Sequence, residues 1–120
     1  MPANDQGMDR TAEVTFVNRF TVHGEPGEFQ RAFQQAAAFL RAKSGFLECT
    51  LLQHAEEETA FLNVARWRDV GAFRRATVGD DFDHHVAAMR KLATSEPGLY
   101  LPRLAFAAER QHHGAGQDRP

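Results

Sequence analysis

The sequence predicts an α+β fold, in which helices cover one face of a four-stranded antiparallel sheet. Two observations support this prediction. Segments with the alternating pattern of strands and segments with helical spacing follow one another in the order strand, helix, strand, strand, helix, strand. The chain has 120 residues, of which 42% are hydrophobic and 25% charged, a composition typical of one globular domain.

The first strand and the first helix have the clearest patterns. Residues 13–22 alternate apolar and polar side chains, as a strand with one buried face does. Pro26 suits the start of a helix, and apolar side chains recur at helical spacing over residues 28–43. Gly45 stands where a left-handed cap commonly ends a helix.

The remaining elements complete the order. Strands are predicted at 46–53, 59–67 and 99–108, and helices from a cap at Asp69 to about Ala76 and from a cap at Asp80 or Asp81 to about Thr94. Pro102 cannot donate to a sheet ladder, so the last strand is expected to be an edge strand or a bulged one.

This order is the ferredoxin-like βαββαβ arrangement. We expect the folded domain to occupy residues 13–109, between flexible segments at 1–12 and 110–120.

Composition excludes several classes of function. The 14 Lys and Arg residues against 16 Asp and Glu give a net charge of -2, so nucleic acid is not an expected partner. Residues 1–11 lack the apolar run of a secretory signal and no segment has the apolar length of a membrane span, so neither secretion nor a membrane partner is expected. Cys49 is the only cysteine, which excludes an intramolecular disulfide and favours the cytoplasm.

Two amides interrupt apolar strand faces. Asn18 shares a face with Phe16 and Phe20, and Asn63 shares one with Phe61 and Trp67. Because the two strands are central neighbours in a βαββαβ sheet, the amides are expected to lie close together. They could bond to each other or to backbone, or they could form a polar spot in an apolar pocket.

Other side chains extend this candidate site. Trp67 carries an indole N–H that needs a partner when buried. His85 falls on or beside the buried side of its helix, marked by Phe82 and Met89, and could be either a core residue or a proton acceptor. Asp81 and His85 could chelate an ion, but no third ligand stands at a suitable spacing, so no metal is expected.

The second face of the sheet also carries apolar residues, namely Val17, Leu62 and Val64. A sheet with helices on one face leaves these side chains uncovered. We therefore expect a homodimer.

Several of these residues resemble the antibiotic biosynthesis monooxygenase family. The resemblance rests on Asn18 in VNRFTV, on Gly45 with Phe46, and on FLNVARW at 61–67 followed by Phe73. It implies a dimeric α+β barrel with a pocket between sheet and helices in each subunit.

The family includes cofactor-free oxygenases that convert anthrone-type polyketides to quinones with O₂ as co-substrate. The resemblance implies catalytic roles for Asn63 and Trp67, with His85 as the proton-transfer candidate, because Phe73 stands where quinone-forming relatives carry a tyrosine. The expected substrate contacts are Asn18, Phe16, Phe73, Phe82 and Met89.

Other functions remain open on the same fold. A polyketide cyclase could use the same pocket for an aldol closure. Haem-degrading members resemble the chain at Asn18, but Ala76 stands where they carry a tryptophan. A ligand-binding role without turnover is the non-enzymatic alternative.

Overall fold

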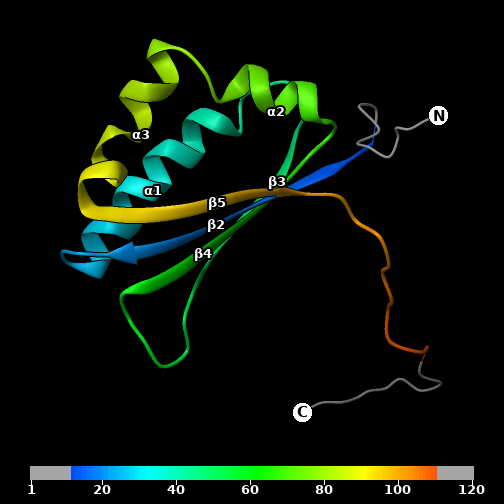
Figure 1. Ribbon diagram of the computed structural model, residues 1–120, viewed down its shortest axis with the longest axis horizontal. Helices are drawn as coiled ribbons and strands as arrows, with labels where there is room; N and C mark the ends of the chain where they lie inside the picture. The colour runs from blue at the N-terminus through cyan, green and yellow to red at the C-terminus, as the bar shows by residue number, and fades with distance from the viewer. Residues whose placement is uncertain (1–11, 111–120) are drawn as a thin grey trace.

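A computed structural model describes residues 12–110 and confirms the α+β fold. The elements are β2 (Val14–Val22), α1 (Pro26–Leu40), β3 (Phe46–Gln53), β4 (Ala60–Trp67), α2 (Val70–Ala76), α3 (Asp80–Leu92) and β5 (Ala93–Tyr100). The strands form one sheet in the order β3-β4-β2-β5, and every neighbouring pair is antiparallel. The helices lie together on one face of this sheet (Figure 1).

Two hydrophobic clusters fill the space between the sheet and the helices. The tryptophan cluster consists of Val14, Ala65, Trp67, Val70, Ala72 and Ala76. The phenylalanine cluster consists of Phe20, Val22, Phe29, Phe33, Phe61 and Ala93. On β2 and β4 the two clusters occupy opposite ends of the same inward face, with Asn18 and Asn63 between them.

The first helix ends close to its predicted boundary. Glu25 accepts a hydrogen bond from the backbone N–H of Gly27, and Pro26 occupies the first turn. The helix ends at Leu40, three residues before the predicted end. Gly45 has a φ of 91°, and a Cβ there would collide with the Cβ of Ala72, so both the backbone and the packing of α2 require glycine.

The two later helices begin differently. Asp69 caps α2 as predicted, because its carboxylate accepts a hydrogen bond of 2.8 Å from the Ala72 N–H. The predicted cap of α3 is wrong: Gly79 holds that position without a side-chain bond, and Asp80 and Asp81 lie in the first turn. Negative charge there still favours the helix through its dipole.

The predicted position of the last strand is wrong. The helix ends at Leu92 rather than near Thr94, and β5 pairs with β2 from Ala93 to Tyr100. Because β5 is an edge strand, it tolerates Pro97.

The chain after Tyr100 leaves the sheet and runs away from the helices (Figure 1). Residues 101–110 form no strand, and the side chains of Leu104 and Phe106 are 81% and 90% exposed. The segments predicted to be flexible, 1–12 and 110–120, lie almost entirely outside the described residues. Among the described residues, no helix has the length and apolar character needed to cross a membrane.

Candidate active site

A cavity of about 280 Å³ lies between the inward face of the sheet and the helices, bounded by the two clusters. Every strand and helix contributes to its lining, which is mostly aromatic and aliphatic. A lining of this kind favours an apolar ligand, whose orientation is set by the few polar groups that reach the cavity.

The Asn18 and Asn63 side chains form the polar floor of the cavity. The two residues stand directly opposite each other in the β2–β4 register, which confirms the expectation that they lie close together. Asn63 is 9% exposed, and Asn18 Oδ1 is buried without a partner among the described residues. An unpaired buried acceptor costs about 1–3 kcal/mol, which favours a ligand that donates to it.

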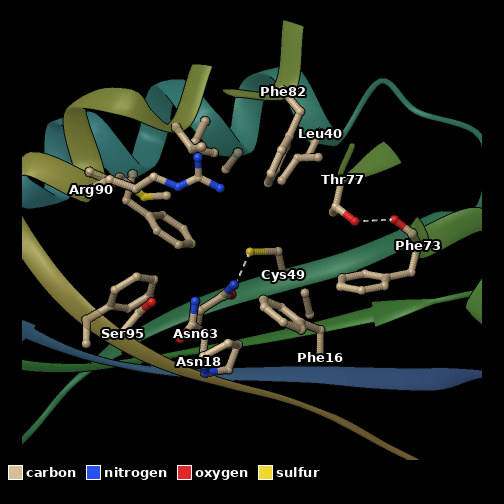
Figure 2. Close-up of a pocket in the computed structure, with 18 of the residues that line it drawn as sticks. Phe16, Asn18, Leu40, Cys49, Asn63, Phe73, Thr77, Phe82, Arg90 and Ser95 are labelled. Carbon is tan, nitrogen blue, oxygen red and sulfur yellow. Dashed lines mark hydrogen bonds between the residues drawn. The ribbon is translucent and has the colours of Figure 1, made fainter. Parts of the chain in front are cut away.

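Asn63 has a partner on the neighbouring strand that sequence reasoning missed. The Cys49 thiol donates a hydrogen bond of 3.2 Å to Asn63 Oδ1, and Figure 2 shows this bond beside the cavity. Burial raises the pKa of the Cys49 thiol, so the group stays protonated at neutral pH and acts as a donor.

Aromatic rings hold Trp67 at one end of the cavity. Its ring centroid lies 5.2 Å from that of Phe46 and 5.8 Å from that of Phe73, both nearly perpendicular to it. Phe16 packs on Phe73 at 4.9 Å. Trp67 is 1% exposed and still contributes to the lining, so its position is fixed by contacts on both sides.

Helix α3 supplies the opposite wall. Phe82, Val86, Met89 and Arg90 face the cavity from it, and Figure 2 shows Arg90 reaching over the amides from above. The Arg90 guanidinium also lies 3.3 Å from the Asp83 carboxylate. Arg90 was missed, although its spacing of four from Val86 and eight from Phe82 would have placed it on this face.

His85 is the one predicted site residue that does not line the cavity. Its ring stacks on Phe39 of α1 with a centroid distance of 4.1 Å, and its Nδ1 lies 2.7 Å from the Asp81 carbonyl oxygen. The helical rotation that turns Phe82 and Met89 inward turns His85 toward α1 instead. Within residues 12–110, no group of three potential ligands is placed to hold a metal ion.

The other predicted residues all line the cavity: Phe16, Asn18, Asn63, Trp67, Phe73, Phe82 and Met89. Ser95 and Thr77 line it as well and were not predicted. Ser95 was missed because the last strand was placed too late in the chain, and Thr77 because it follows the end of α2.

Comparison with known proteins agrees with this arrangement. The family described as antibiotic biosynthesis monooxygenase matches residues 14–98. The deoxynogalonate monooxygenase of Streptomyces nogalater is 44% identical over 112 residues, which cover 93% of this chain and 94% of that protein.

Solved structures share the fold. SnoaB, a cofactor-independent oxygenase from Streptomyces nogalater, is 45% identical, with a TM-score of 0.78 over 81% of this chain and 99% of that one. A conserved protein from Methanosarcina mazei Go1 is 14% identical and shows the fold alone, with a TM-score of 0.63 over 78% of this chain and 96% of that one. The chain belongs to the antibiotic biosynthesis monooxygenase family.

Proposed function

We propose that this chain is a cofactor-independent monooxygenase that uses O₂ to oxidise an anthrone-type aromatic polyketide to a quinone. The observation that carries the proposal is the pair of amides, Asn18 and Asn63, at the floor of an apolar cavity. The name of the deoxynogalonate monooxygenase and the description of SnoaB as a cofactor-independent oxygenase support the same reaction class.

The cavity suits a flat polycyclic substrate. Phe16, Trp67 and Phe73 form an aromatic wall at one end, and Phe82 and Met89 close the side toward α3. A ligand between these walls loses its water shell, which strengthens every polar contact made within the cavity.

The substrate supplies the electrons for the reaction. Loss of a proton from the anthrone methylene gives a carbanion stabilised as a phenolate, and this anion reduces O₂ and forms a carbon–oxygen bond to it. The resulting peroxide loses water, so one oxygen atom stays in the new carbonyl and the other leaves in water.

The protein stabilises the negative charge that develops on the substrate oxygen. The Asn63 amide and the Trp67 indole offer N–H donors, and Arg90 offers a positive charge from the opposite wall. Asn18 Oδ1, buried without a protein partner among residues 12–110, accepts from a substrate hydroxyl.

The described part of the lining holds no carboxylate, imidazole or phenol. We therefore assign the proton transfer to water and the lowering of the substrate pKa to the donors and Arg90. No step is assigned to His85, which is stacked on Phe39. The expected result is that His85→Ala keeps kcat within about twofold of wild type.

A homodimer and a cytoplasmic location are part of the proposal. Val17, Leu62 and Val64 lie on the sheet face that the helices do not cover, and Leu104 and Phe106 are exposed on the segment that leaves the sheet. A second copy would bury these side chains. Light scattering at micromolar concentration tests this, and a monomeric mass refutes it. The unpaired Cys49 suits a reducing compartment.

The reaction is tested with metal-free protein and a model anthrone under ¹⁸O₂ and under nitrogen, with products followed by mass. We expect enzyme-dependent incorporation of one labelled atom into the quinone, above the background of spontaneous oxidation. No conversion above background would leave the cyclase and ligand-binding roles as the alternatives.

A further inference from the structure

Cys49 and Asn63 meet across two strands in a way that the sheet register makes possible. Cys49 stands opposite Ala65 on β4, while Asn63 stands opposite Leu51 on β3, so the thiol and the amide are diagonal neighbours on the inward face. Because Ala65 is small, nothing separates them, and the Cys49 Sγ lies 3.2 Å from Asn63 Oδ1.

This bond distinguishes the two ends of the Asn63 amide. An amide oxygen and nitrogen have nearly the same size, so packing alone does not choose between the two orientations related by a half-turn. In the structure the Cys49 thiol donates to the amide oxygen, which therefore occupies the end of the amide nearest Cys49. The nitrogen, with its two N–H donors, is then left for the cavity.

The opposite orientation would present an oxygen to the substrate. A carbonyl oxygen facing a developing phenolate repels it, so the same residue would oppose the reaction. Asn18 already presents an acceptor without a partner in the described structure. The site therefore gains a donor only if the Asn63 amide is held in one orientation.

We propose that Cys49 is a positioning residue, whose thiol fixes the Asn63 side chain with its N–H donors toward the substrate. The expected effect of this positioning on kcat rests on the proposed oxygenase function. Cys49 itself takes no part in the chemistry, and its thiol remains reduced and protonated throughout the reaction.

Three substitutions separate the hydrogen bond from packing. Cys49→Val is close in size and lacks the donor, Cys49→Ala lacks both volume and donor, and Cys49→Ser keeps a donor. We expect kcat to fall about threefold to tenfold in the first two, as for one lost hydrogen bond, and to stay within about twofold of wild type in Cys49→Ser. KM should change little in all three variants.

A double-mutant cycle links the effect to Asn63. In an Asn63→Ala background, Cys49→Val should cause no further loss, because there is no amide left to orient. Full additivity of the two losses would overturn the proposal, as would equal losses in Cys49→Val and Cys49→Ser.

A measurement made without substrate tests the positioning role of Cys49 independently of the proposed function. The side-chain ¹⁵N–¹H₂ signals of Asn63, identified by their absence in Asn63→Ala, should shift or broaden in Cys49→Val and be retained in Cys49→Ser. Unchanged signals in Cys49→Val would overturn the positioning role. If wild-type protein oxidises no anthrone, the oxygenase proposal fails while these spectra still decide the role of Cys49.

Discussion

The tryptophan cluster and the phenylalanine cluster are built from the same two strands but differ in how tightly they close. In the phenylalanine cluster, Phe29 is fully buried, with its ring centroid 5.0 Å from those of both Phe20 and Phe61. In the tryptophan cluster, Trp67 and its partly buried neighbour Phe73 face the cavity. Phe29 lies outside the cavity lining, although Phe20, Phe33 and Ala93 of the same cluster border the site. Trp67, the largest side chain of the other cluster, lines the site directly.

The amide pair explains why the apolar residues on the inward face of the sheet form two clusters rather than one. Asn18 lies between Phe16 and Phe20 on β2, and Asn63 holds the matching position on β4. Apolar residues at both positions would join the two clusters into one core. The structure instead contains an unpaired acceptor and a cavity, a cost in stability that is typical of a functional site.

The largest effect is expected at Phe29, the closed centre of the phenylalanine cluster. Phe29→Ala should lower the free energy of unfolding by about 3–5 kcal/mol, because it leaves a void among three aromatic rings. Chemical denaturation measures this loss. Val78→Ala is the control, since Val78 is 66% exposed and its truncation should cost less than about 0.5 kcal/mol. A loss below 1 kcal/mol for Phe29→Ala would show that Phe29 is not the closed centre of this cluster.

Substitution of the amides should separate stability from activity. Asn18→Leu removes an unpaired buried acceptor and should raise the free energy of unfolding by about 1 kcal/mol. Asn63→Ala removes a donor and should lower kcat about tenfold or more. Both should reduce anthrone turnover, measured by quinone absorbance. If Asn18→Leu is instead less stable than wild type, the amide is part of the core and the contrast between the regions fails.

The sequence predicts on which face of a strand a residue lies better than it predicts where a helix or strand begins and ends. Alternation on β2 and β4 depends only on the two-residue period of a strand, so Asn18, Asn63 and Trp67 were placed correctly on one face. The position of β5 was not predicted correctly, because pairing with β2 overrides the turn preference of Pro97 and Gly98.

Contacts between elements could not be predicted from the sequence, for a different reason. The Cys49 bond to Asn63 depends on the β3–β4 register, which shifts between Phe46 and Glu48. The direction of His85 depends on a rotation of α3 that brings the ring against Phe39. A shift of one residue in a register or of one position around a helix reverses such assignments.

Arg90 tests whether the wall opposite the amides takes part in the reaction. Arg90→Gln should lower kcat/KM about tenfold, because a charged donor is lost from the cavity. Asp83→Asn is the matched control: it removes the exposed ion pair of Arg90 and should leave kcat/KM within about twofold. Equal losses in both variants would mean that the ion pair on α3, and not contact with substrate, explains the effect.

The smallest effect concerns the cap that holds α2 over the tryptophan cluster. The Ala72 N–H, followed by Arg68, holds the pKa of the Asp69 carboxyl below its ordinary value. A lowered pKa in the folded state stabilises the protein above the unfolded pKa of about 4, and this contribution disappears as the pH falls through the folded pKa. Asp69→Asn keeps a capping side chain without the charge, so its unfolding midpoint should fall less steeply below about pH 4 than that of wild type. Fluorescence of Trp67, the only tryptophan, follows the transition within this cluster, and equal slopes in the two proteins would show that the cap carries no pH dependence.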